Sequence, residues 1–225
     1  MTTVFKLFAK VLQRQLPPKI LIYSALNKTN YLLKTGNRRF EFERLYLEDA
    51  DLWNFRSSSY EQRKCELTIA RVLSWRRGSK NAFEVGCSVG AFTKTLASHF
   101  KRATALDVSR EALRAASDYN RSEKNVDFVH GDFRSLHIDG RYDVIFCAEI
   151  LYYILEKDVQ KVCRQLDRYL TSNGIIILVN GIAKGPPNFF YFSGWEEALS
   201  KYFYRLSKEV IHDSSRPYKI VIFER

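Results

Sequence analysis

One stretch near the middle of the chain constrains the fold more than any other. Residues 81–90 have the sequence Asn-Ala-Phe-Glu-Val-Gly-Cys-Ser-Val-Gly. The apolar residues at its start predict a short buried strand, and Gly86 and Gly90 predict a turn after it. Helical spacing of apolar residues begins at Ala91. A strand, a glycine turn and a helix in this order open nucleotide-binding α/β units, where the helix N-terminus presents free N–H groups.

The spacing acidic-x-Gly-x-small-x-Gly resembles motif I of the class I S-adenosylmethionine (SAM)-dependent methyltransferases. A dinucleotide fold would have G-x-G-x-x-G and a pyrophosphate at the helix. SAM has no phosphate but carries cationic groups, which suit an acidic residue, and glycines let the backbone approach a ligand. Taken alone, the stretch also fits an ordinary turn with incidental glycines. The resemblance places these residues at the cofactor: Glu84, Gly86, Cys87, Ser88 (where the family usually has Gly) and Gly90.

Length and composition bound the class of protein. The 225 residues, 46% of them hydrophobic, suffice for one α/β domain with a sizeable core and an extension. No apolar run approaches the roughly 20 residues of a transmembrane helix. The four cysteines lack metal-site spacing, so we expect reduced thiols, no metal and a cytoplasmic location.

The positive charge is uneven along the chain. The net charge is +11, and residues 1–44 hold nine basic and two acidic residues. We therefore divide the chain into a basic helical extension, 1–50, and a methyltransferase domain, 51–225. Residues 3–16 predict an amphipathic helix. It could contact a membrane surface, cover the active site, serve as a transit segment or pack on the domain.

A capping box, Ser58 with Glu61, predicts a helix that runs to about Trp75. Aromatic and basic residues surround its start. Many SAM enzymes close over the cofactor with such a segment, and Arg56 is our candidate for direct contact. The alternative is that the aromatic residues pack and the arginines are solvated. The candidates for this cover are Trp53, Arg56, Tyr60 and Arg63.

A second strand, 104–106, leads into Asp107 and Val108. A carboxylate at the end of this strand is placed to accept hydrogen bonds from both ribose hydroxyls. Capping of the next helix is the other role for Asp107, but Ser109 already fits that role. We therefore expect Asp107 to bind the ribose, with Val108 beside it.

A third strand, 126–129, is followed by Asp132 and Phe133. This arrangement fits an adenine site. Asp132 would accept a hydrogen bond from the exocyclic amine of adenine, and Phe133 would cover the face of the ring. A simple polar turn is the alternative.

The continuous apolar run 142–148 predicts a fully buried central strand. Ligands of doubly wound sheets bind beyond the carboxyl ends of the strands. We therefore expect Ala148 at the cofactor, and Glu149, Tyr152 and Tyr153 as catalytic residues where a methyl acceptor would meet the sulfonium. The tyrosines could instead begin the next helix as core residues.

The rest of the chain completes the predicted architecture. A helix at 156–170 and a strand at 174–179 are followed by two strands, 202–212 and 218–223, joined by a turn. Strands alternating with helices and ending in a hairpin indicate an α/β, Rossmann-like class I methyltransferase fold. We expect seven strands in the order 3-2-1-4-5-7-6, with helices on both faces.

Several segments resemble a narrower family, the nodulation protein S-type N-methyltransferases. They are 84–93, Asp-Val at 107–108, Ala-Glu-Ile-Leu-Tyr-Tyr-Ile at 148–154, and the leader 51–64. The resemblance implies methyl transfer from SAM, with S-adenosylhomocysteine (SAH) as product, to the amine of a deacetylated sugar in a chitin-like oligosaccharide. Glu149 would hold or deprotonate the amine, and the two tyrosines would orient it.

Three other functions remain open. The positive charge suggests an RNA methyltransferase. That class has Asn/Asp-Pro-Pro-aromatic after the fourth strand, whereas the similar Pro-Pro of this chain, 185–189, follows the fifth. A small-molecule N- or O-methyltransferase held at a membrane by residues 3–16 is the second. The third is a binding module without activity, which the retained cofactor residues disfavour.

Overall fold

The computed structural model describes residues 39–51, 53–182, 192–213 and 216–225. The expected helix at 3–16, most of the extension and the Pro-Pro segment 185–189 lie outside these ranges. In chain order the helices and strands are α3 (Arg39–Glu48), α4 (Ser59–Trp75), β1 (Asn81–Val85), α5 (Ala91–His99), β2 (Arg102–Asp107), α6 (Arg110–Tyr119), β3 (Val126–His130), β4 (Tyr142–Ala148), the 3-10 turns η1 (Leu151–Tyr153) and η2 (Glu156–Asp158), α7 (Val159–Tyr169), β5 (Leu170–Gly181), α8 (Phe192–Ser200), β6 (Tyr204–Ile211) and β7 (Tyr218–Glu224).

The strands of the described chain form one seven-stranded sheet in the order β3-β2-β1-β4-β5-β7-β6. Strands β1 to β5 run parallel, and β7 pairs antiparallel with both β5 and β6. This confirms the expected order and the closing hairpin. The crossing from β1 to β4 is the switch point beyond which ligands bind in such sheets.

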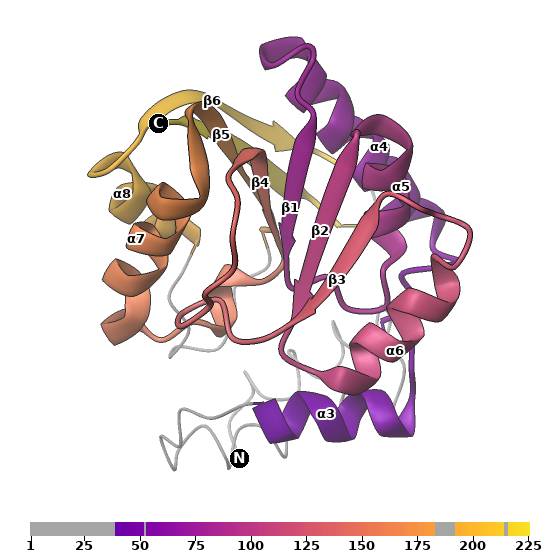
Figure 1. Cartoon of the computed structure of the whole chain (residues 1–225). Coiled ribbons are helices and arrows are strands. Elements are labelled where there is room, and N and C mark those ends of the chain that lie inside the picture. The colour runs from indigo at the N-terminus through magenta and orange to yellow at the C-terminus, as the bar shows by residue number, and fades with distance from the viewer. Residues whose placement is uncertain (1–38, 52, 183–191, 214–215) are drawn as a thin grey trace, which may run out of the picture.

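Helices cover both faces of the sheet, with α4, α5 and α6 on one side and α7 and α8 on the other (Figure 1). Alternation along β4 supplies both cores. Val144 and Phe146 pack with Val72 of α4 on one face. Ile145 packs with Trp195 of α8 on the other.

The helix starts follow the expected caps. Ser58 Oγ accepts from the backbone N–H of Glu61 at 3.3 Å, and Ser109 Oγ accepts from that of Ala112 at 3.1 Å. Because Ser109 caps α6, the carboxylate of Asp107 is free for another role. The helix expected at 156–170 is shorter, because η2 precedes α7.

Helix α8 has no counterpart among the expected elements, whereas α3 lies in the extension that was expected to be helical. Helix α3 lies across the carboxyl ends of β1 and β2 and contacts α6 (Figure 1). Charged residues interrupt its apolar ones, so its sequence lacks a clear apolar stripe. Helix α8 is anchored by Trp195, which is completely buried. The division of the chain at residue 50 stays a prediction.

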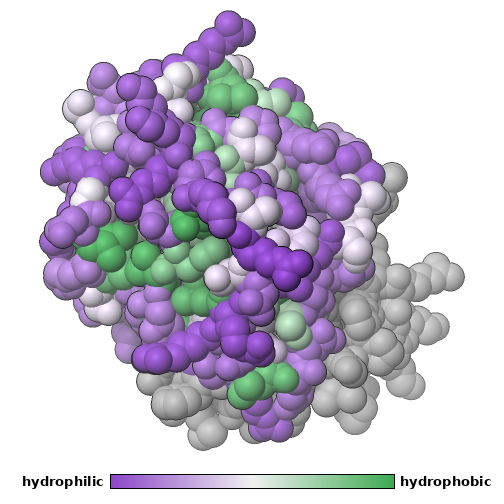
Figure 2. Space-filling model, turned by 45° about the vertical axis from the view of Figure 1, so that its right-hand side comes forward, coloured by the Kyte–Doolittle hydropathy of each residue, from purple (hydrophilic) through white to green (hydrophobic). Residues whose placement is uncertain are grey.

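The face of the molecule on the side of α4 to α6 is mainly hydrophilic (Figure 2). Figure 2 brings the side of α4 to α6 forward, and hydrophilic residues cover most of it around a smaller hydrophobic area. No helix within the described ranges combines the length and hydropathy needed to cross a membrane.

Candidate active site

The turn after β1 is tied to the end of β2 by backbone hydrogen bonds. The N–H groups of Gly86 and Cys87 both donate to the carbonyl of Leu106 at 2.8 Å. The N–H of Ser88 donates to Asp107 Oδ2 at 2.8 Å. The turn and the carboxylate therefore form one unit at the expected cofactor position.

Contacts within the protein already require glycine at two positions of this turn. Gly86 and Gly90 have φ of +79° and +74°, which side chains disfavour. A Cβ on Gly86 would lie 2.7 Å from Ile150 Cδ1, and one on Gly90 would lie 2.9 Å from Ala116 Cβ. The sequence suggested close approach of a ligand as the reason for these glycines, and packing is a second one. Ser88 adopts φ of +52° although it carries a side chain.

Asp107 is buried and accepts one backbone hydrogen bond on each oxygen. Ser88 donates to Oδ2, and Ser109 donates to Oδ1 at 2.9 Å. Burial raises the pKa of Asp107 to about 6, although backbone donors act in the opposite direction. Each carboxylate oxygen can accept a second hydrogen bond, so the group can still hold a diol.

Helix α3 covers this unit, which the sequence did not indicate. The hydroxyl of Tyr46 donates to Ser88 Oγ at 2.7 Å. Burial and then Asp107 raise the pKa of Tyr46 well above its ordinary value. The ring of Phe42 meets that of Tyr153 edge-on at 5.0 Å. Helix α3 therefore connects the two ends of the site.

A cleft runs from the turn after β1, along α4 and the start of α5, to the end of β4. The predicted site residues that line it are Arg56, Glu84, Gly86, Cys87, Ser88, Ala148 and Glu149. The predicted residues outside its lining are Gly90, Asp107, Val108, Asp132, Phe133, Tyr152 and Tyr153. The structure thus brings the acidic residue of the motif and Glu149 to one cavity.

Two buried groups on the cleft wall have raised pKa values. Glu84 Oε2 accepts from Thr93 Oγ1 at 2.6 Å, and burial raises the pKa of Glu84 to about 8. This carboxyl group is therefore largely protonated at neutral pH in the free protein. Burial also raises the pKa of the Cys87 thiol. All four cysteines lie in the described chain and are free.

Arg56 lines the cleft, and its guanidinium is held by contacts with α6. Its Nη2 donates to the carbonyl of Ala115 at 2.8 Å, and its guanidinium lies 4.6 Å from the ring centre of Tyr119. Its Nε is buried and has no hydrogen-bond partner. A buried donor without a partner is costly, so this atom is suited to a ligand acceptor.

The other residues proposed to cover the site have structural contacts. Trp53 packs on Tyr46 with ring centres 5.6 Å apart. Tyr60 donates its hydroxyl to the carbonyl of Arg216 at 2.8 Å. Arg63 is exposed and lies 3.7 Å from Asp213. Only Trp53 of these three therefore belongs to the cover formed with α3.

Glu149 lies directly after β4 with φ of +52°. Its Oε1 accepts from Lys64 Nζ at 3.2 Å and from the N–H of Gly181 at 3.0 Å. Both side-chain hydrogen bonds that it makes within the described residues go to Oε1. Its Oε2 therefore remains available at the cleft.

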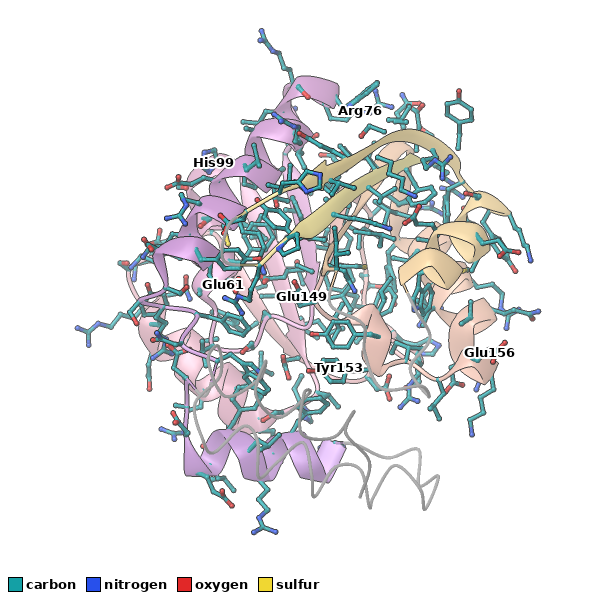
Figure 3. All side chains as sticks on the ribbon, turned by 180° about the vertical axis from the view of Figure 1, so that it is seen from behind. Glu61, Arg76, His99, Glu149, Tyr153 and Glu156 are labelled. Atoms are coloured by element: carbon teal, nitrogen blue, oxygen red, sulfur yellow. The ribbon has the colours of Figure 1, made fainter. Side chains whose placement is uncertain are left out.

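Lys64 is a site residue that the sequence analysis missed. Its side chain on α4 is buried, and its Nζ lies 2.7 Å from Glu61 Oε2 and 3.2 Å from Glu149. Figure 3 shows Glu61 and Glu149 close together at the centre of the molecule. Burial lowers the pKa of Lys64, but the two carboxylates outweigh burial and the net shift is upward. The spacing of Glu61 and Lys64 on one helix face was the available signal.

The two tyrosines lie in η1, immediately beyond β4. Their ring centres are 4.5 Å apart, and both are partly buried. Burial, then Tyr153 and Glu149, raise the pKa of Tyr152 well above its ordinary value. Tyr152 is therefore a neutral hydroxyl near Glu149 over the physiological pH range.

The residues expected around an adenine ring make contacts within the protein. Asp132 pairs with Arg134, whose Nε lies 2.9 Å from Oδ1. Burial raises the pKa of Asp132, but Arg134 outweighs burial and the net shift is downward. Phe133 is only 4% exposed, with its ring 5.8 Å from that of Phe83 in the core. Its place over an adenine face stays a prediction. Val108 is partly buried beside Asp107, and its carbonyl lies 3.1 Å from His130 Nε2.

The chain matches one family of known proteins over most of its length. The family model described as Nodulation protein S (NodS) matches residues 37–185, more than half of the chain. The chain belongs to the nodulation protein S family. The Nodulation protein S of Azorhizobium caulinodans is 28% identical over 132 residues, which cover 58% of this chain and 63% of that protein. That of Sinorhizobium fredii is 32% identical over 104 residues, covering 46% and 48%. These matches span less than two thirds of either relative.

A solved structure supports the fold of this nodulation protein S family member. The crystal structure of N-methyltransferase NodS from Bradyrhizobium japonicum WM9, in complex with SAH, superposes with a TM-score of 0.72. The match covers 84% of this chain and 99% of that one at 19% identity. The strand order and this likeness establish the Rossmann-like class I methyltransferase fold. No group of three or more His, Cys, Asp or Glu suited to a metal occurs in the described part of the chain.

Proposed function

We propose that the protein is a SAM-dependent N-methyltransferase. The observation that carries the proposal is the position of Glu149 at the end of β4, with one oxygen anchored and the other available at the cleft that begins at the motif I turn. A carboxylate in this place is suited to an amine, which donates N–H bonds and gains positive charge during transfer. Membership of the nodulation protein S family supports the same reaction.

The residues of the turn and of β2 fit the cofactor. Asp107 retains two acceptor positions for the ribose hydroxyls, and the partnerless Nε of Arg56 suits the carboxylate of SAM. The buried Glu84 lies on the same wall and suits the ammonium group. Bound SAM would supply a methyl group on a sulfonium, which is a good leaving group. The proposed contacts also include Gly86, Cys87, Ser88, Gly90, Val108, Asp132 and Ala148.

The side chains beyond β4 would act on the acceptor. Glu149 would accept an N–H bond from the amine, stabilise the charge that develops on nitrogen and take up its proton. Tyr152 and Tyr153 would orient the amine by hydroxyl contacts or by attraction of the cation to their rings. Most of the rate would come from alignment of the amine with the transferred methyl group.

The acceptor that we propose is the amine of an amino sugar or oligosaccharide. Family membership supports this class, and the carboxylate and neighbouring tyrosines suit a polar amine. A cytoplasmic location, with membrane contact through residues 3–16, remains part of this proposal. Those residues lie outside the described ranges, so liposome co-sedimentation with and without residues 1–18 tests the contact.

The proposal is tested by transfer of labelled methyl from SAM. A deacetylated chitooligosaccharide, total RNA and a simple aliphatic amine would be compared with the same enzyme preparation. Label on the sugar amine supports the proposed acceptor. Label on RNA alone would contradict it and favour a nucleic-acid substrate. Label on none of them while SAH still binds would reject this acceptor class and retain only cofactor binding.

A further inference from the structure

Lys64 is a buried cation on a helix face that also buries Glu61 and the apolar residues Ile69 and Val72. Its residue surface is only 6% exposed, although it comes from the middle of α4. Burying an ammonium group costs several kcal/mol unless it is paired well. Lys64 has two carboxylate partners, Glu61 and Glu149, from separate elements. Its placement therefore depends on both.

The geometry around Glu149 shows what this lysine can do. Lys64 approaches Oε1 from α4, and the backbone N–H of Gly181 approaches the same oxygen from β5. Two donors on one oxygen fix the rotation of the carboxylate, and the φ of +52° fixes the backbone beneath it. The second oxygen is left for a ligand.

We propose that Lys64 is a positioning residue for methyl transfer: it holds Glu149 turned so that Oε2 faces the acceptor amine. The inference rests on the proposed function, because it assigns Glu149 to the acceptor. Lys64 would not touch the reacting atoms. It would act through Glu149 alone.

A second ion pair holds the lysine in place. Glu61 Oε1 lies 3.1 Å from Arg216 Nη2, so Glu61 is fixed between Arg216 and Lys64. Arg216 also lies 4.2 Å from the ring centre of Tyr60. A series of ion pairs therefore connects the segment before β7 to the cleft, in the order Arg216, Glu61, Lys64 and Glu149.

The charged and titratable groups that face Glu149 come from three places. Helix α4 contributes Lys64, Glu61 and Tyr60, η1 contributes Tyr152, and Arg216 lies behind Glu61. Burial is the main cause that raises the pKa of Tyr60 to about 12, so that hydroxyl is neutral. Within the described chain, Lys64 is the cation that pairs directly with Glu149.

The test replaces Lys64 by Met, which has a similar length but no charge. We expect kcat for the best acceptor of the panel to fall roughly 100-fold, because the carboxylate can rotate. The Kd for SAH should change little. Lys64→Arg should recover most of kcat, because it restores the charge that pairs with Glu149. The matched control is Arg71→Met, on the same helix, which removes only the surface pair with Glu209.

A measurement without turnover separates this inference from the proposed function. Protein labelled with [5-13C]glutamate gives one carboxyl resonance per glutamate, and Glu149→Gln assigns the resonance of Glu149. The 13C relaxation of this resonance should show a more mobile carboxylate in Lys64→Met and a fixed one again in Lys64→Arg. Unchanged relaxation would overturn the proposal, even if activity fell. If wild-type protein methylates no acceptor, the proposed function fails and the relaxation still decides whether Lys64 holds Glu149. If Lys64→Met does not fold, Lys64→Gln is measured against the same two outcomes.

Discussion

The two halves of the cleft are built by different means. The half proposed to bind the cofactor, called the cofactor half, consists mainly of backbone: positive φ at Gly86 and Gly90, and backbone N–H groups that donate to Leu106 and Asp107. The half proposed to bind the acceptor consists of side chains, joined in a series of ion pairs that links α4, Glu149 after β4 and the segment before β7. A backbone site can be encoded in ten consecutive residues, whereas a side-chain site depends on how distant elements meet. Substitutions in each half test this difference.

The largest effect should follow loss of the carboxylate that joins the turn to β2. Asp107→Ala removes the expected ribose acceptor and leaves the N–H of Ser88 without its partner. We expect SAH binding to weaken by at least roughly 100-fold, as measured by isothermal titration calorimetry. Asp127→Ala, which removes an exposed carboxylate paired with Arg102, is the control and should bind normally. Normal binding by Asp107→Ala would remove Asp107 from the cofactor site.

Loss of charge at the other end of the cleft should affect turnover and not cofactor binding. Glu149→Gln keeps the shape of the side chain but loses its negative charge. We expect kcat to fall on the order of 100-fold or more with nearly unchanged SAH affinity. Glu209→Gln, at a surface ion pair, is the control. An equal loss of SAH affinity would mean that the two halves are not separable.

A glycine pair can separate backbone strain from packing in the cofactor half. Gly78 and Gly86 have φ of +83° and +79°, but only at Gly86 would an added Cβ have a neighbour, Ile150, within 4 Å. Gly78→Ala should cost about 1–2 kcal/mol of unfolding free energy from strain. Gly86→Ala should cost about 1 kcal/mol more, from overpacking. Urea unfolding measures both, and equal losses would show that Ile150 moves aside freely.

The smallest effect should be a pH-dependent gain in stability at Glu84. Its pKa of about 8 in the folded protein exceeds the ordinary 4.5, because it is buried. The folded state therefore binds a proton that the unfolded state has lost, and stability falls as pH rises from about 4.5 to 8. Glu84→Gln should remove this loss of folding stability, because its side chain does not titrate. We expect the stability of Glu84→Gln relative to wild type to rise between pH 5 and pH 9. A constant difference in urea unfolding at both pH values would contradict the assignment.

Local sequence was sufficient for much of the fold. The turn at 81–90, the caps Ser58 and Ser109, and the continuous apolar run of β4 are set by neighbouring residues, and the structure has each of them. The terminal hairpin likewise follows from two apolar runs around a turn. These features were predictable because the interactions that form them lie within a few residues of one another.

Tertiary structure alone decided the partners of the functional side chains. Lys64 meets Glu149 across 85 positions of sequence, and Tyr46 meets Ser88 across 42. Phe133 packs against Phe83, 50 positions away in the sequence. Apolar periodicity indicates which face of an element is buried, but it does not specify which side chain of another element lies opposite. The sequence of this protein therefore determined its sheet and cofactor turn, whereas the packing of α3 and α4 on that sheet determined how the cleft is covered and how Glu149 is held.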